Sequence, residues 1–185
     1  MSDSEIVLSP APDLRRSLIR SVHDAEALHA KVLGGAESTA AWLRGFTGSP
    51  IQLLTALRFQ TVGHTPLTGE ALNVTEQINQ TFTIWVSLRA VERLIEMHPE
   101  ANGFRLALAT SSGRDIESVE PDLVAAEVFS ATHPGSNQKL RKDIARLASD
   151  PARYRYVFFA APKYATGRQP RLETAPGVEV HCVEL

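Results

Sequence analysis

The hydrophobic pattern of this 185-residue chain changes its period at Gly103. Before that residue, apolar side chains recur at three- and four-residue steps, which is typical of amphipathic helices. After it come short apolar runs of strand length, bounded by turn residues. This order predicts an α/β (α+β) protein, in which a helical N-terminal region precedes a mixed central sheet with helices packed on its faces.

Four helices are predicted before Gly103, at residues 13–33, 38–44, 49–59 and 70–97. Gly34-Gly35 is expected to end the first helix, because glycine is common just past helix C-termini. His98-Pro99 is expected to end the last one. At this length we expect one compact domain with an N-terminal elaboration.

Five strands and one further helix are predicted after Gly103. The strands are expected at residues 104–110, 114–119, 123–131, 154–160 and 178–185. The helix is expected at residues 136–148, with Ser136 as its N-cap. Three consecutive strands followed by a helix and two more strands indicate a mixed sheet with helices on its faces.

Composition and charge limit the classes of function. Apolar residues make up 43% of the chain, which is enough for a sizeable core, yet no apolar run approaches the length of a membrane span. The single cysteine, Cys182, excludes an internal disulfide, and we expect a cytoplasmic protein. Residues 1–137 hold 10 Lys and Arg against 16 Asp and Glu (net −6), whereas residues 138–185 hold 9 against 5 (net +4). The basic C-terminal part could face a polyanion such as DNA.

One carboxylate interrupts the predicted strand 123–131. Glu127 stands inside the apolar run, where an unpaired carboxylate would cost several kcal/mol to bury. A metal ion, a cationic partner or simple exposure could account for it. Asp115 lies on the preceding predicted strand, so the two acids can come close together across the hairpin. Paired carboxylates with a backbone carbonyl are what Mg²⁺ prefers, and such an ion can activate water for attack on a phosphodiester.

These elements and residues together resemble the restriction-endonuclease-like fold of the PD-(D/E)XK nucleases. That core runs helix, three antiparallel strands, crossover helix and fourth strand (αβββαβ). The resemblance covers roughly residues 70–185, so it implies that these residues form the core and that residues 1–69 are a helical N-terminal elaboration of the same compact domain. Its signature is an Asp on the second strand and (D/E)-x-K on the third. Asp115 matches the first acid and Glu127-Val128-Phe129 occupies the second motif. The resemblance implies a Mg²⁺- or Mn²⁺-dependent nuclease acting on DNA, with Asp115, Glu127 and the Val128 carbonyl as metal ligands.

The lysine of the motif is replaced by Phe129, and members of the superfamily can supply that cation from the following helix. At about 100° per residue, Lys139 and Arg141 flank the sheet-facing side of the 136–148 helix, whereas Lys142 points away. We expect Lys139 to serve, because it lies in the first turn. Arg141 would instead join the residues expected to hold phosphates, namely Arg141, Arg146, Arg153 and Arg155.

Two further acids are alternatives or additions. Pro121-Asp122 spells the PD of the signature, but it stands too close to Glu127 to reach a paired strand, so Asp115 is favoured. The first core helix of the superfamily often contributes a glutamate, and Glu76 is of the matching type. The phase of its helix places Glu76 nearly opposite the apolar stripe, so its role stays open.

Three hypotheses follow. The leading one is a metal-dependent DNA nuclease, which by analogy with the superfamily could act as a homodimer. In the second, Phe129 marks a decayed site, and the fold serves as a scaffold for DNA or a partner protein. In the third, the resemblance is accidental and Glu127 faces water on an edge strand, far from Asp115.

Overall fold

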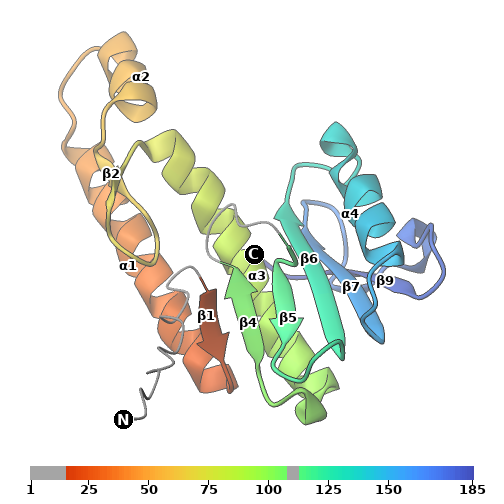
Figure 1. Ribbon diagram of the computed structural model, residues 1–185. Coiled ribbons are helices and arrows are strands. Elements are labelled where there is room, and N and C mark those ends of the chain that lie inside the picture. The colour runs from red at the N-terminus through yellow and green to blue at the C-terminus, as the bar shows by residue number, and fades with distance from the viewer. Residues whose placement is uncertain (1–15, 108–112) are drawn as a thin grey trace, which may run out of the picture.

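The computed structural model describes residues 16–107 and 113–185, which form a seven-stranded sheet with helices against both faces (Figure 1). The helices are α1 Val22–Gly45, α2 Pro50–Phe59, α3 Val74–Met97 and α4 Lys139–Ala148, with short 3-10 turns η1 Pro99–Ala101, η2 Ser136–Gln138 and η3 Pro170–Leu172. The strands are β1 Arg16–Ile19, β2 Gly63–His64, β3 Ala71–Leu72, β4 Phe104–Ala107, β5 Ile116–Ser118, β6 Val124–Ser130, β7 Tyr154–Ala160, β8 Gly167–Arg168 and β9 Val178–Cys182. The α/β class, with N-terminal helices ahead of a mixed sheet, is confirmed.

The sheet has the order β1-β4-β5-β6-β7-β9-β8. Strands β1, β4, β5 and β6 pair antiparallel, β7 and β9 continue parallel to β6, and β8 is antiparallel to β9. Parallel neighbours need a crossover connection, and α4 lies in the one between β6 and β7. Strands β6 and β7 are therefore central and covered on both faces, which explains their nearly continuous apolar sequences.

Helices α3 and α4 lie on opposite faces of the sheet. Helix α3 packs with β4, β6 and β7 in one apolar cluster, and α4 packs with β6, β7 and β9 in another. Leu140, Ile144 and Leu147 of α4 are buried on the sheet, as their spacing predicts. The predicted cap is wrong, since Ser136 begins the turn η2 and the regular helix starts at Lys139.

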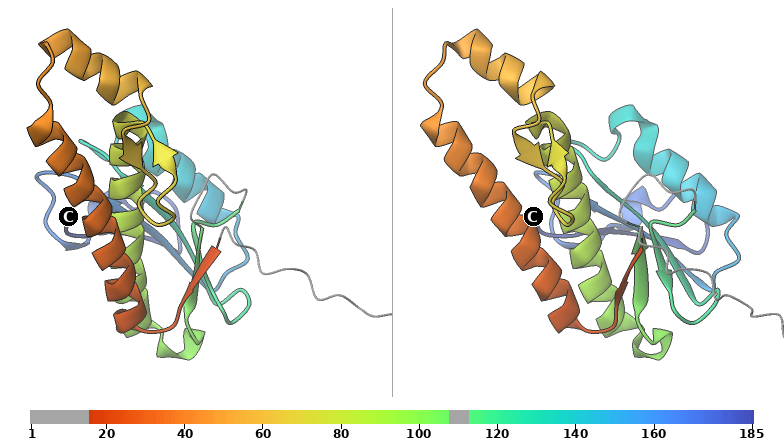
Figure 2. Two further views of the ribbon diagram at one scale, coloured as in Figure 1. Left: turned by 90° about the vertical axis from the view of Figure 1, so that its left-hand side faces the viewer. Right: turned by 60° about the vertical axis from the view of Figure 1, so that its left-hand side comes forward.

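The N-terminal helices differ from the prediction in one respect. Helix α1 starts at a capping box, in which Ser21 Oγ accepts from the Asp24 amide, and it continues through Gly34-Gly35 to Gly45. The predicted break at Gly34-Gly35 is therefore wrong, and the helix expected at 38–44 is the last part of α1. Figure 2 shows α1 and α3 side by side, with α2 beyond the end of the sheet. The predicted α2 is confirmed.

Packing explains why the two glycines do not break α1. Gln77 of α3 donates to the Gly35 carbonyl over 3.1 Å and accepts from Thr39 Oγ1 over 2.7 Å. These buried contacts join the two helices across the position of the expected break. They outweigh the cost of glycine in a helix, which is about 1 kcal/mol per residue relative to alanine.

Two strands lie where helix was expected. Residues 16–19 form the edge strand β1, paired with β4, and residues 13–15 lie outside the described residues. Residues 71–72 form β3, so α3 begins at Val74, capped by the Asn73 side chain. The strand predicted at 104–110 is described as far as Ala107.

Within residues 16–107 and 113–185, no helix is both long and apolar enough to cross a membrane.

Candidate functional site

Asp115 and Glu127 come together on neighbouring strands. The β5–β6 register pairs Ile116 with Ala126, so Asp115 directly precedes, and Glu127 directly follows, this pair of residues. The Asp115 carboxylate accepts a hydrogen bond from the Val128 amide (2.9 Å), and its carbonyl accepts one from the Ala107 amide (2.9 Å). Asp115 is thus tied to β4 on one side and to β6 on the other.

Glu127 is buried, with 1% of its side chain exposed, on the face of β6 that α4 covers. Its neighbours on that face, Ala125 and Phe129, belong to the apolar cluster under α4. Strand β6 lies between β5 and β7, so the hypothesis of an exposed edge strand is wrong. Arg146 of α4 supplies the cationic partner, because its guanidinium lies against Glu127 Oε2. The two groups form an ion pair. Among the described residues, no donor makes a hydrogen bond to Glu127 Oε2.

Asp143 is a third carboxylate at this site, and the sequence analysis missed it. Its side chain is 4% exposed, Lys139 Nζ lies 2.7 Å from its Oδ1, and Arg146 Nη2 lies 3.8 Å from the same oxygen. Burial raises the pKa of Asp143, the Lys139 ammonium opposes that shift, and the Asp115 charge adds to it. The helix phase could have revealed this residue, because Asp143 lies nearer the Leu140–Leu147 side of α4 than Lys139 does.

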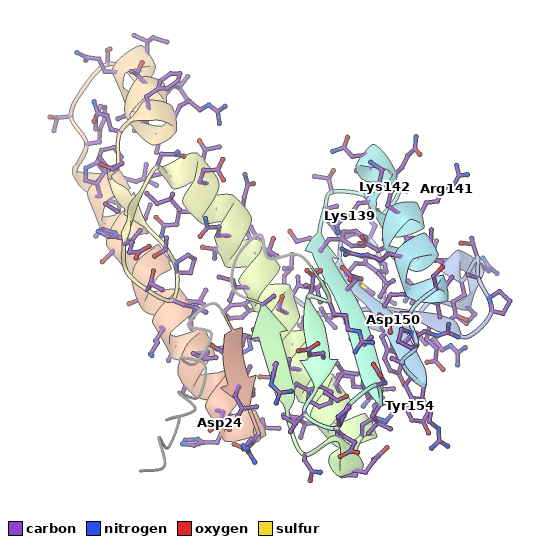
Figure 3. The ribbon with its side chains drawn as sticks, viewed as in Figure 1. Asp24, Lys139, Arg141, Lys142, Asp150 and Tyr154 are labelled. Atoms are coloured by element: carbon purple, nitrogen blue, oxygen red, sulfur yellow. The ribbon has the colours of Figure 1, made fainter. Side chains whose placement is uncertain are left out.

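The cations of α4 are placed differently from the prediction. Lys139 pairs with Asp143 rather than with Glu127, and Arg146, expected at a phosphate, occupies the position next to Glu127. Arg141 and Lys142 are exposed, and Figure 3 shows them with Lys139 in the first turns of α4. The motif position itself holds Phe129, which stacks on Phe159 (ring centroids 5.7 Å apart) in the apolar cluster.

The other predicted site residues lie elsewhere. Arg155 donates to the carbonyls of Leu147, Ala148 and Gly177, so it caps the end of α4. Arg153 is exposed, with its guanidinium 5.0 Å from the centre of the Tyr154 ring. Both arginines line a separate hollow of about 600 Å³ at the start of β7. Glu76 is exposed in the first turn of α3, and no hydrogen bond or ion pair within the described residues joins it to Asp115 or Glu127.

Asp122 does not take the place of Asp115. It lies in the β5–β6 turn, with a positive φ of 50°, and Arg114 Nη2 lies 2.8 Å from its Oδ1. The same guanidinium also binds Asp150. Arg114 helps to line a hollow of about 360 Å³ beside the candidate site, formed by Gly113, Arg114, Glu117, Glu127, Arg146 and Asp150.

The donor atoms at this site fit a hard divalent cation. Mg²⁺ is usually bound by one or two carboxylates and keeps several waters, and Asp115 and Glu127 offer carboxylates of that type. Glu127 is buried, and the guanidinium of the half-exposed Arg146 lies against it. Within residues 16–107 and 113–185 there is no set of three or more His, Cys, Asp or Glu placed to hold a metal.

Comparison of the chain with protein-family models, with curated proteins and with solved structures finds no match. A functional proposal therefore depends on the residues, the fold and the geometry described above.

Proposed function

We propose that this chain is a metal-dependent phosphodiester hydrolase acting on DNA, with a restriction-endonuclease-like core. The order α3, β4, β5, β6, α4, β7 corresponds to the helix, three antiparallel strands, crossover helix and fourth strand of that core. The observation that carries the proposal is the position of the two acids. Asp115 directly precedes the second strand, and its carboxylate accepts a hydrogen bond from the amide of Val128, the residue that follows the buried Glu127 of the third.

Each residue has a defined role in this proposal. Asp115, Glu127 and the Val128 carbonyl would hold Mg²⁺ or Mn²⁺, which lowers the pKa of a bound water and offsets charge on the phosphate. Lys139, fixed by Asp143, supplies the cation that the motif lacks at Phe129. Arg141, exposed on α4, and Arg153, at the start of β7, can contact phosphates. A homodimer, which sedimentation would detect, would allow both strands of a duplex to be cut.

Cleavage of supercoiled plasmid and of single-stranded DNA, with Mg²⁺ or Mn²⁺, tests the proposal. The substitution Glu127→Gln keeps the shape of the side chain and removes its charge. We expect it to lower the cleavage rate by at least about a hundredfold, because metal catalysis contributes several kcal/mol. Glu96→Gln, which alters an exposed acid on α3, is the control and should retain the wild-type rate. Cleavage that survives Glu127→Gln would contradict the assignment.

A second function, an inactive nuclease fold that serves as a scaffold for DNA or a protein, is favoured by a specific observation. Phe129 is buried, and two cations of α4, Lys139 and Arg146, are paired with acids. The scaffold hypothesis predicts that the chain does not cleave DNA, whether or not it binds DNA. It also predicts no saturable Mn²⁺ binding at millimolar concentration. Metal-dependent cutting by the wild-type chain would exclude it.

A further inference from the structure

Two buried carboxylates share one guanidinium at the candidate site. Arg146 Nη2 lies against Glu127 Oε2 and 3.8 Å from Asp143 Oδ1. The side chains of Glu127 and Asp143 are 1% and 4% exposed, whereas that of Arg146 is 50% exposed. The cation, unlike the two acids, therefore reaches solvent. It can move from one acid to the other without opening the core.

Asp143 has an oxygen available for a second donor. Its Oδ1 is bound by Lys139, but its Oδ2 is buried and accepts no hydrogen bond from the described residues. Leaving such an oxygen without a donor costs about 1–3 kcal/mol. Arg146 stands three residues further along the same helix, a spacing at which side chains meet. Since Arg146 Nη2 already lies 3.8 Å from Oδ1 of this carboxylate, rotation of the arginine side chain can bring a donor to Asp143.

We propose that Arg146 is the resident counter-cation of Glu127, that a divalent cation must displace it in order to bind there, and that Asp143 then receives the guanidinium. This inference rests on the proposed function, because it takes Glu127 to be a metal ligand. Two cations in contact with one buried carboxylate repel each other strongly, since the surroundings screen charge poorly. Asp143 is then a positioning residue. Arg146 lines the same hollow as Glu127, so the displaced guanidinium stays at the site.

Mn²⁺ binding to the full chain, followed by calorimetry and by the electron paramagnetic resonance of free Mn²⁺, tests the competition directly. We expect Arg146→Gln to bind Mn²⁺ at least about tenfold more tightly than the wild type, because the competing charge is removed. Lys142→Gln removes the same charge from an exposed position of the same helix. It should change the affinity by less than about twofold.

Asp143→Asn tests the second half of the inference. In the wild-type background it should weaken Mn²⁺ binding, because the displaced Arg146 loses its acceptor. In the Arg146→Gln background the same change should have little effect, and the double-mutant cycle measures that coupling. An equal loss of affinity in both backgrounds would mean that Asp143 acts on the metal through its charge alone. That result would overturn its role as acceptor.

The outcomes separate this inference from the proposed function. A folded Arg146→Gln that binds Mn²⁺ no more tightly than the wild type overturns the inference, while metal-dependent cleavage could persist. If Arg146→Gln binds Mn²⁺ and the wild type does not, the inference is supported and a metal-dependent wild-type enzyme is contradicted. If neither protein binds Mn²⁺, the inference and the proposed function are both contradicted. If Arg146→Gln does not fold, Arg146→Met removes the same charge and keeps a long, unbranched side chain. We expect that variant also to bind Mn²⁺ at least about tenfold more tightly than the wild type, and an unchanged or weaker affinity would overturn the inference.

Discussion

Glu127 stands in a strand whose other residues are almost all apolar, and a cation from another element offsets its charge. Removing the cation would leave the Glu127 carboxylate uncompensated in a poorly screening environment, although the half-exposed Arg146 makes that cost smaller than for a fully buried pair. Replacing both partners with apolar residues of similar volume is often neutral. Stability alone therefore does not explain the presence of Glu127 and Arg146, and this agrees with the metal-binding role proposed above.

Tyr156 offers a prediction that does not depend on the proposed function. Its hydroxyl lies 2.8 Å from His98 Nε2, and burial, with a smaller effect of the Glu179 charge, raises its pKa to about 12. The unfolded chain ionises this tyrosine near pH 10, whereas the folded chain does so only about two units higher. Its contribution to stability is therefore complete below pH 10 and is lost as the pH rises toward 12. The loss should reach up to about 3 kcal/mol.

Urea unfolding between pH 8 and pH 11.5, for the wild type and for Tyr156→Phe, measures that contribution. At pH 8 the variant should be less stable by about 1–3 kcal/mol, because His98 loses its partner. The difference should shrink above about pH 10, since phenylalanine cannot ionise. Stability curves that fall in parallel over this range would show that Tyr156 is not the group responsible.

The residues of the candidate site could be predicted only in part. The strand pattern and the resemblance identified Asp115 and Glu127, because both signals are local in sequence. The partner of Glu127 could not be chosen in the same way. Lys139 and Arg146 lie on the same side of α4, and which of them reaches Glu127 depends on how the helix sits over β6. The helix phase places Asp143 toward the buried side of α4, where an acid is unusual, so only the structure shows that it belongs to the site.

At the scale of elements, replacing glycine with alanine should change stability in opposite directions in α1 and in the turn before β4. Gly34 lies inside α1, and a Cβ there would meet no atom within 4 Å. Gly34→Ala should therefore stabilise the protein by about 0.5–1 kcal/mol. Gly103 has a φ of 105°, and its Cβ would lie 2.8 Å from the Ile19 carbonyl oxygen. Gly103→Ala should cost more than about 1 kcal/mol.

Thermal and urea unfolding of the two glycine variants and of the wild type measure whether each substitution raises or lowers the free energy of unfolding. A destabilised Gly34→Ala would mean that α1 is interrupted in solution, as the sequence alone had predicted. A Gly103→Ala variant of unchanged stability would contradict the close approach of Gly103 to Ile19.

Elements were predictable where a pattern was long or flanked by clear signals. Strands β6 and β7 and helix α3 were found because their apolar patterns are sustained, and α2 because Ser49-Pro50 marks its start. Strand β1 was missed because its four residues continue an apparent helical spacing, and only pairing with β4 makes them a strand. The two-residue strands β2, β3 and β8 are fixed by tertiary contacts and leave little trace in the sequence.

At the scale of the whole molecule, the helical N-terminal region shares a core with the sheet. Ile19, Ala25 and Val32 are fully or almost fully buried in the cluster that contains α3 and β4. His29 of α1 lies 3.2 Å from Glu92 and makes an edge contact with the Trp85 ring, both on α3. The division at residue 69, drawn from the resemblance, therefore separates residues that are packed together.

A fragment of residues 70–185 should for this reason not fold cooperatively by itself. It lacks β1, which leaves the edge of β4 unpaired, and it lacks α1, which exposes apolar residues of α3 to water. Each large apolar side chain so exposed costs about 1.5–3 kcal/mol, and a few such losses equal the usual stability of a domain. Circular dichroism melts of the fragment and of the full chain, in one buffer, test this. The full chain should give one sharp transition and the fragment a broad one, whereas a sharp transition of the fragment near the same temperature would show that the nuclease-like core is an independent domain.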